Sequence, residues 1–355
     1  MGITGAWARA GWDVTVVTLT TAEHDFFALQ PGVRHLRVVI EPQSKGFLAS
    51  IVSNVRRIVA LRRTLSAIRP HVSLGMMSSS AILLAFAGLG LPGRKYGSER
   101  VYPPMLPLHP GKAKVRRYAY GLLDGVVCQT AEVAKWVALN TRAKDVPVVP
   151  NPISLPLPRS EPTVRPADHL SPGASCLLAV GRLSEQKQFD RLVETFARIA
   201  ADHPLWKLVI LGDGPDRNTL EAQARALGMS ERIHLLGSCG NLEDWYRRAD
   251  LFVLTSRFEG FPNVLLEAMA HGAPVVAMNC PTGPSDMIED RVDGILVPPD
   301  DFEALEATLR TTMTDASLRA RLATAAEGVN ARFATSRIME LWNRSLGLPT
   351  MEVGQ

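Results

Sequence analysis

The feature that most constrains this chain is a regular alternation of short apolar runs and amphipathic segments between residues 176 and 298. Such alternation is typical of a parallel sheet whose strands are joined by helices. We therefore expect a doubly wound α/β domain in this part of the chain. The pattern predicts strands at 176–180, 207–211, 233–237, 251–255, 274–278 and 295–298, and helices near 188–201, 216–227, 241–248, 262–271 and 284–289.

The first half of the chain repeats the alternation and predicts a second domain of the same class. Its expected strands are 14–17, 36–40, 72–74, 94–97 and 125–128, and its expected helices are 1–11, 45–69, 79–90, 111–122 and 130–140. A proline-rich stretch at 147–158, followed by polar residues, predicts a linker. We assign domains to 1–150 and 174–330, the linker to 151–173, and a C-terminal helix and tail to 331–355. Ligands of such sheets bind at the carboxyl ends of the strands, in a cleft between the domains.

Two turns that follow predicted strands hold residues suited to a phosphate. The first runs from Gly181 to Lys187, and the charges of Arg182 and Lys187 suit a diphosphate. Solvated surface cations are the alternative explanation for this pair. The second turn contains Gly212 and Gly214, which permit close backbone approach but specify little alone.

A third stretch, residues 251–271, predicts a strand, a glycine turn and a helix with Pro262 in its first turn. The free N–H groups of such a helix end suit a phosphate. Glu259 precedes the helix and Glu267 lies eight positions later, roughly 12 Å along the axis. A turn carboxylate and a solvated helix face are the alternatives for these two glutamates.

The three turns together resemble family 4 of the retaining nucleotide-sugar glycosyltransferases. The resemblance rests on GRLSEQK, VILGDGP, HLLG and EGFPNVLLEAMA, followed by GAPVVA and DGILVPPDD. It implies the GT-B architecture, in which two doubly wound Rossmann-like domains face each other across a cleft. The segments CPTGPSDMIE and GSERVYPP resemble the branch that uses UDP-hexoses or UDP-N-acetylhexosamines to assemble lipid-linked glycans or surface polysaccharides.

The resemblance implies a role for each matching residue. Arg182 and Lys187 would neutralise the departing diphosphate, Glu259 would hold hydroxyls of the donor sugar, and Glu267 would bind the ribose. Departure and attack on one face of the sugar would retain the anomeric configuration. No metal or other cofactor is implied, because the chain has no Asp-x-Asp at a strand end. The implied donor-binding residues are Gly181, Gly212, Gly214, Gly260, Phe261, Asn263, Val264, Leu265 and Glu267.

The first domain departs from the family pattern. A first strand and a glycine-rich loop, roughly 15–25 residues, precede the corresponding helix in relatives. Their absence would leave two buried strand edges unpaired, so we expect a misassigned start, a truncated product, or strands that close up. Glu99 and Arg100 are candidates for the acceptor side, with an ordinary strand-end ion pair as the alternative. His109 is expected to be structural.

Charge is unevenly divided along the chain and indicates an anionic partner for the first domain. Residues 1–160 hold 20 Lys and Arg against 8 Asp and Glu, and the remainder holds 19 against 27. Acidic lipid is favoured over nucleic acid, because no nucleic-acid motif or interleaved aromatic residues are present. The arginine-rich helix 45–69 predicts a membrane-surface helix or a solvated basic face. Lys112, Lys114, Arg116 and Arg117 form a second basic cluster.

Two further patterns bear on the location of the protein. Residues 72–93 carry no formal charge, but their continuous apolar part is shorter than a membrane span, so a buried strand, loop and helix is expected. The four cysteines lack CxxC spacing, which fits buried thiols in a reducing compartment. We therefore expect a cytoplasmic protein, peripheral on the inner face of a membrane.

Two other functions fit the same sequence. A UDP-sugar 2-epimerase shares the two-domain architecture, and a truncated chain could be an inactive remnant that only binds a nucleotide sugar. Detecting sugar transfer to an acceptor would distinguish the glycosyltransferase from both.

Overall fold

The computed structural model describes residues 2–19, 29–38 and 47–349 and divides the chain into two compact units. Unit 1 comprises Met1–Pro152 and Thr335–Gln355, and unit 2 comprises Ile153–Ala334. The segment predicted as a linker therefore belongs to unit 2 from Ile153 onward. The predicted C-terminal helix and tail return to unit 1 from Thr335.

Unit 2 contains one parallel sheet whose strand order reverses at its first strand. The order is β11-β10-β9-β6-β7-β8, so β6 lies between the two halves of the sheet. The carboxyl ends of β6 and β9 therefore mark the switch point at which ligands of doubly wound sheets bind. The strands are β6 (Ser175–Val180), β7 (Trp206–Leu211), β8 (Ile233–Gly237), β9 (Leu251–Leu254), β10 (Val275–Met278) and β11 (Ile295–Val297).

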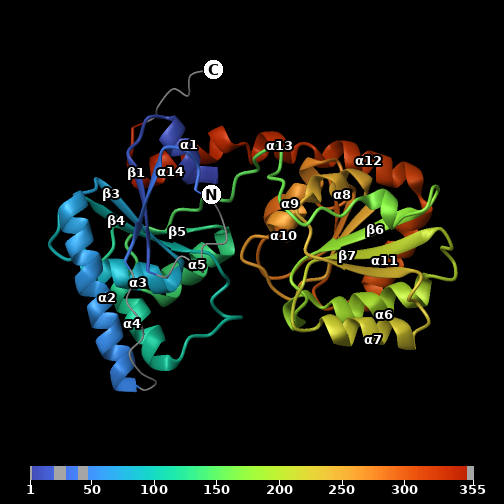
Figure 1. Ribbon diagram of the computed structural model, residues 1–355, viewed down its shortest axis with the longest axis horizontal. Coiled ribbons are helices and arrows are strands. Elements are labelled where there is room, and N and C mark those ends of the chain that lie inside the picture. Colours follow the sequence, from blue (N-terminus) through green and yellow to red (C-terminus); the bar gives the residue numbers. More distant parts are fainter. Residues whose placement is uncertain (1, 20–28, 39–46, 350–355) are drawn as a thin grey trace. The chain divides into compact units, whose positions relative to one another are not determined.

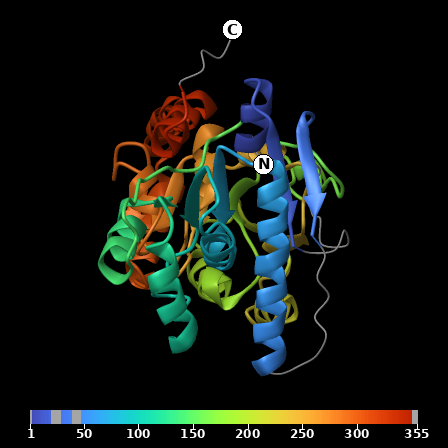
Figure 2. The same cartoon turned by 90° about the vertical axis from the view of Figure 1, so that its left-hand side faces the viewer.

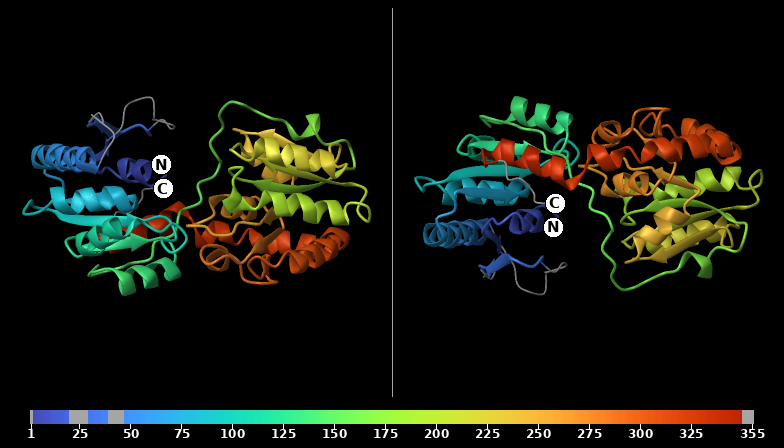
Figure 3. Two further views of the ribbon diagram at one scale, coloured as in Figure 1. Left: turned by 90° about the horizontal axis from the view of Figure 1, so that it is seen from below. Right: turned by 90° about the horizontal axis from the view of Figure 1, so that it is seen from above.

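Helices cover both faces of this sheet. Figure 1 shows α6 (Phe189–Ile199), α7 (Arg217–Ala226) and α11 (Phe302–Thr314) on one face, and α8 (Leu242–Arg248), α9 (Asn263–Ala270) and α12 (Ala316–Ala326) on the other. Figure 3 shows the same layers from two further directions. Short helices α10 (Pro284–Met287) and α13 (Val329–Arg332) complete the unit.

The core of unit 2 follows from its sequence pattern. Every residue of β9 and β10 is buried, as expected of parallel strands covered on both faces, which read as continuous apolar runs. Apolar residues of α6 recur at helical spacing and meet the sheet. They are Phe189, Leu192, Val193, Phe196 and Ile199. The predicted strands and helices of this domain, and the α/β fold class, are confirmed.

Unit 1 contains two separate parallel sheets among its described residues. One pairs β1 (Val14–Thr18) with β2 (Val33–Arg37), and the other has the order β3-β4-β5. The predicted strand at 36–40 overlaps the end of β2, and its last two residues lie outside the described ranges. The strands of the second sheet are β3 (Val72–Met76), β4 (Arg94–Glu99) and β5 (Gly125–Cys128).

The strand pairing in unit 1 bears on the expected absence of a first strand. In the described residues, β1 pairs only with β2 and β3 pairs only with β4, so one edge of each strand is unpaired, as predicted. Most residues of β1 and β3 are half-buried. The unpaired edges therefore belong to strands whose described residues are covered only in part.

In unit 1, the helix that follows β3 packs on the three-stranded sheet and lies between two further helices, whereas the first helix contacts β1, β2 and the C-terminal helix. The helices of this unit are α1 (Gly2–Arg9), α2 (Phe47–Ile68), α3 (Met77–Ala87), α4 (Pro110–Tyr120), α5 (Ala131–Asn140) and α14 (Thr335–Leu346). The uncharged segment forms the strand β3 and the helix α3, as expected, but the strand is mostly half-buried and only part of the helix is buried. Within the described ranges, no helix is long and apolar enough to cross a membrane.

The C-terminal helix α14 is fixed to the first helix of the chain. The rings of Trp7 and Trp342 meet edge to face at 6.0 Å, and Trp7 Nε1 donates to Asn343 Oδ1 at 2.9 Å. Arg94 at the start of β4 donates to the Leu346 carbonyl at 3.1 Å. These contacts explain why the chain returns to unit 1 after Ala334.

Candidate functional site

The three predicted turns of unit 2 form one assembly at the carboxyl edge of the sheet. Gly181 N–H donates to Leu211 O at 2.9 Å and Leu183 N–H donates to Asp213 O at 3.0 Å, which joins the turns after β6 and β7. Gln186 Nε2 donates to Phe258 O at 2.7 Å, which joins the turn after β6 to the turn after β9. The predicted convergence is therefore present at the switch point.

Two predicted glycines are required by contacts between these turns. A Cβ atom on Gly212 would lie 1.9 Å from the Gly181 carbonyl oxygen, and one on Gly214 would lie 2.2 Å from the Leu183 oxygen. Gly212 also has a φ of +135°, which other residues rarely adopt. Both glycines thus bring the turn after β7 against the turn after β6. Their role in donor binding remains a prediction.

Lys187 and Glu259, predicted to hold different parts of a donor, bind each other. Lys187 Nζ lies 2.6 Å from Glu259 Oε1, and both side chains are nearly buried. Thr255 Oγ1 donates to the Lys187 carbonyl at 2.7 Å, and Thr282 Oγ1 donates to the Glu259 carbonyl. The pair therefore holds a cation and a carboxylate in fixed positions at the switch point.

Thr282 is a site residue that the sequence did not single out. Its only signal in the sequence is its position in the CPTGPSDMIE segment, which resembles the branch of the family that uses UDP-sugars. Gly283 follows it with a φ of +102°, and a Cβ there would lie 2.3 Å from Pro262 Cδ. This segment therefore packs directly on the turn that carries Glu259.

Arg182 presents a cation separate from the Lys187 pair. Its side chain is exposed, and within the described part of the chain it forms no ion pair. Arg257, an exposed neighbour in the third turn, is paired with Glu185 at 2.7 Å. An exposed cation fits both a diphosphate contact and a solvated surface residue, so the predicted role of Arg182 stays a prediction.

The N-terminus of α9 has no side-chain cap. Asn263 is exposed and Val264 is half-buried, whereas Leu265 N–H donates to the Pro262 carbonyl at 3.0 Å. Phe261 is buried and meets Phe333 edge to face at 6.0 Å, with Gly260 beside it in the turn. Leu265 N–H and the Phe261 ring therefore have partners within the protein, and the donor-binding roles of these residues and of Val264 stay predictions.

Glu267 is held by a buried tyrosine. Tyr246 on α8 is fully buried, and its hydroxyl donates to Glu267 Oε2 at 2.9 Å. Burial raises the pKa of Glu267, and the hydrogen bond from Tyr246 acts in the opposite direction. The Tyr246 ring stacks on His271 at 5.7 Å. The sequence missed Tyr246 and His271, because nothing in their spacing indicates this contact.

Glu99, predicted as an acceptor-side residue, is fully buried in unit 1. Ser78 Oγ donates to it at 2.8 Å and Tyr120 donates at 2.7 Å, and Arg116 Nη1 lies 4.0 Å away. The structural alternative, a strand-end interaction, describes Glu99 better than exposure to a cleft. Burial and the Glu99 charge raise the pKa of Tyr120.

Arg100, the other acceptor-side candidate, donates to Asn151 Oδ1 at 2.7 Å. Its Nη1 is buried without a hydrogen-bond partner, and burial lowers the pKa of this guanidinium to about 10. Arg100 stays a candidate for binding an acceptor. His109 caps α4, where its Nδ1 accepts from Gly111 N–H at 3.3 Å, so the expected structural role is confirmed.

The structure buries three of the four cysteines. Cys128, Cys176 and Cys280 are buried and all four cysteines are free thiols. Burial raises the pKa of Cys176 and of Cys280 to about 12, so these thiols stay protonated. Across the described ranges, no three His, Cys, Asp or Glu residues are arranged to hold a metal ion.

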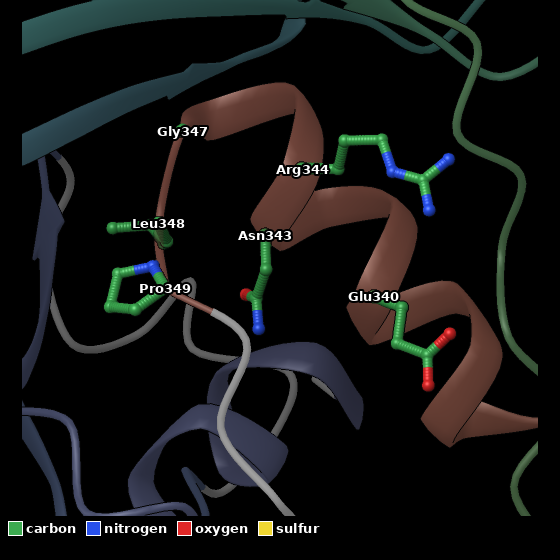
Figure 4. Close-up of a pocket in the computed structure, with 6 residues that line it drawn as sticks. All are labelled: Glu340, Asn343, Arg344, Gly347, Leu348 and Pro349. Atoms are coloured by element: carbon green, nitrogen blue, oxygen red, sulfur yellow. The ribbon is translucent and has the colours of Figure 1, made fainter.

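Two surface pockets are lined by residues outside the predicted site. One, of about 580 Å³, borders the end of α14, where Asn343 points toward α1 and Arg344 points away (Figure 4). The other, of about 570 Å³, lies beside the start of α11. Neither is lined by a predicted donor residue.

Comparisons with known proteins agree with the fold, and the matched region includes the three turns. The family model described as Glycosyl transferases group 1 matches residues 163–329. The exopolysaccharide phosphotransferase SCO2592 of Streptomyces coelicolor is 32% identical over 80% of this chain and 29% of its own length. The amylovoran biosynthesis glycosyltransferase AmsD of Erwinia amylovora is 31% identical over 65% of this chain and 64% of its own length. The chain thus spans less than two thirds of both relatives.

Solved structures support the same architecture. The Anabaena protein Alr3699/HepE in complex with UDP-glucose has a TM-score of 0.80 at 19% identity, over 98% of this chain and 94% of that chain. At this identity the likeness shows the fold alone. The chain therefore has the GT-B type of α/β fold, as predicted.

Proposed function

We propose that the chain, whose residues 163–329 match the family model described as Glycosyl transferases group 1, is a retaining glycosyltransferase. It moves a hexose or N-acetylhexosamine from a UDP-sugar to a lipid-linked glycan or surface-polysaccharide precursor, without a metal. The observation that carries the proposal is the ion pair of Lys187 with Glu259, which joins the turn after β6, where Arg182 also lies, to the turn that precedes α9.

Each part of that arrangement suits one part of a nucleotide-sugar. The diphosphate gains negative charge as it leaves, and Lys187, Arg182 and the positive end of α9 favour that charge. Glu267 lies further along α9, where its carboxylate accepts hydrogen bonds from the ribose hydroxyls. Glu259 precedes the helix and holds hydroxyls of the sugar, which fixes the anomeric carbon for attack.

The Lys187–Glu259 pair defines how these roles are combined. A buried ion pair is favourable only when the remaining polar atoms are also satisfied. A donor supplies them, because its phosphate oxygens accept from Lys187 and its sugar hydroxyls donate to Glu259. The acceptor hydroxyl attacks the face from which the diphosphate departs, so the anomeric configuration is retained.

The choice of donor and acceptor draws on similar proteins. HepE was solved with UDP-glucose, and AmsD is named for polysaccharide biosynthesis. SCO2592 is named a phosphotransferase, but only 29% of its length is matched, so that activity is not carried over. We also propose that the chain works at an anionic membrane surface on the cytoplasmic side, which its free thiols would fit.

A donor screen tests this function. The purified chain is incubated with a set of UDP-hexoses and UDP-N-acetylhexosamines and with lipid-linked acceptors, with and without a chelator. We expect one donor to give glycosylated acceptor with retained configuration at an unchanged rate in chelator. Epimerised UDP-sugar would indicate a 2-epimerase, and donor binding without transfer or hydrolysis would indicate an inactive remnant. Either result would overturn the proposal.

A further inference from the structure

We propose that one outward face of unit 1, formed by α2, α4 and the loop before α4, docks on the anionic headgroups of a lipid bilayer. We call this the basic–apolar face. It is independent of the transfer chemistry, so it can be tested without any enzyme assay.

Helix α2 presents valine and arginine on the side away from its core contacts. Val52, Val55 and Val59 lie at i, i+3 and i+7, which places them on one stripe. Each is between 43% and 52% exposed. By the same helical period, Arg56 and Arg63 fall on this stripe, and both are exposed. The opposite side packs on the unit 1 core through residues 58, 61 and 65.

Helix α4 repeats the same mixture. Lys114, Val115 and Tyr118 lie at i, i+1 and i+4 on α4 and define one stripe, and Leu122 follows just after the helix ends at Tyr120. Val115, Tyr118 and Leu122 are between 43% and 54% exposed, and Lys114 and Arg117 of the same helix are also exposed. The loop before α4 adds exposed Met105 and Leu106.

Not every basic residue of the two predicted clusters belongs to this face. Arg62 Nη1 donates to the Ala87 carbonyl at 3.0 Å, so it ties α2 to the end of α3. Arg116 is buried, and its guanidinium lies 4.6 Å from the centre of the Trp136 ring. These two arginines are structural.

The two helices lie on the same side of unit 1. Figure 2 shows α2 and α4 on either side of α3, with their N-terminal ends at the same end of the unit, and α3 contacts both. Crossover helices of a parallel sheet all begin at its carboxyl edge, which explains this agreement. The positive N-terminal ends of both helices therefore add to the lysine and arginine charges.

The chemistry of this face identifies an anionic lipid surface as its partner. Neither residues 47–68 nor residues 101–122 contain an acidic residue, so a second copy of the same face would be repelled. Of the 18 large apolar side chains exposed among the described residues, 14 lie in unit 1. Aliphatic side chains interspersed with cations suit headgroups and acyl boundaries. Nucleic acid favours stacking aromatics instead.

Vesicle sedimentation with the full chain tests the inference. We expect binding to vesicles of phosphatidylcholine with phosphatidylglycerol, weakening as salt is raised, and little binding to phosphatidylcholine alone. The variants V55S/V59S and K114E/R117E should each weaken binding roughly tenfold. They should leave the far-ultraviolet circular dichroism unchanged.

The control is L205S/L227S, which removes two exposed leucines of unit 2 and should bind as the wild type does. Equal binding by all variants, or equal binding to neutral vesicles, would overturn the inference. The inference would also be overturned if RNA displaced the protein from the vesicles and if this RNA binding were weakened by V55S/V59S. Because the readout is sedimentation, failure here is distinguishable from failure of the donor screen.

Discussion

A buried tyrosine donates a hydrogen bond to a glutamate in each of the two units, but the two carboxylates are placed differently. Glu99 in unit 1 is fully buried and also accepts from Ser78, with Arg116 nearby. Glu267 in unit 2 is half-buried, and among the described side chains only Tyr246 bonds its carboxylate. A carboxylate whose bonds are all used by the protein stabilises it, whereas one with an unused oxygen can take a ligand.

The largest contrast is expected when each glutamate is replaced by alanine. Glu267→Ala removes the acceptor for two ribose hydroxyls, which should lower kcat/KM for the donor by roughly 100- to 10,000-fold. Glu99→Ala leaves Arg116 as a buried unpaired charge, which should lower the free energy of unfolding by about 3–5 kcal/mol. Kinetics and urea unfolding of both variants provide the measurements. Loss of donor affinity in a folded Glu99→Ala variant would contradict the proposed difference between the two carboxylates.

The next effect concerns Glu259, whose partner is a lysine instead of a tyrosine. Lys187→Ala removes the cation closest to the departing diphosphate and should lower kcat roughly 100- to 1,000-fold. Arg257→Ala is the matched control, because Arg257 is a cation of the same site but is paired with Glu185. Its kcat should change by less than about threefold, as surface pairs contribute little. A similar loss of kcat in both variants would indicate that the position of the cation relative to Glu259 does not matter for transfer.

The strands of unit 2 could be predicted because strands buried on both faces have continuous apolar sequences. The pairing of Lys187 with Glu259 could not, because these residues are 72 positions apart and their contact depends on how two turns pack. The same holds for Tyr246, whose hydroxyl meets Glu267 only through the packing of α8 on α9. Sequence pattern also could not show that Arg62 bonds to the end of α3 or that Arg116 is buried, since a long side chain can reach in either direction.

Removing the two tyrosine hydroxyls sharpens the comparison with a smaller effect. Tyr246→Phe releases the carboxylate of Glu267 from its fixed orientation, so KM for the donor should rise roughly tenfold with little change in kcat. Tyr120→Phe removes the same group from the other pair and should lower the unfolding free energy by about 1–3 kcal/mol. Its KM should be that of the wild type. A positioning role for Tyr246 would be contradicted by equal KM values in the two variants.

The smallest expected effect is a shift in the pH dependence of donor affinity and of stability. Burial raises the pKa of Glu267, and ribose hydroxyls donate to the ionised form, so donor affinity should increase as pH rises through that pKa. A carboxyl group whose folded pKa is raised contributes stability at low pH that is lost as pH rises through it. The wild type should therefore lose stability relative to Glu267→Gln over the same range.

Tyr246→Phe removes the hydrogen bond that lowers this pKa, so both the affinity rise and the stability loss should move to higher pH. Tyr120→Phe should leave them in place, because Tyr120 bonds a different carboxylate. The measurements are KM for the donor and the urea midpoint as functions of pH. A donor KM that does not vary with pH, or a displacement shared by both variants, would show that Glu267 does not bind the donor as an ionised carboxylate held by Tyr246.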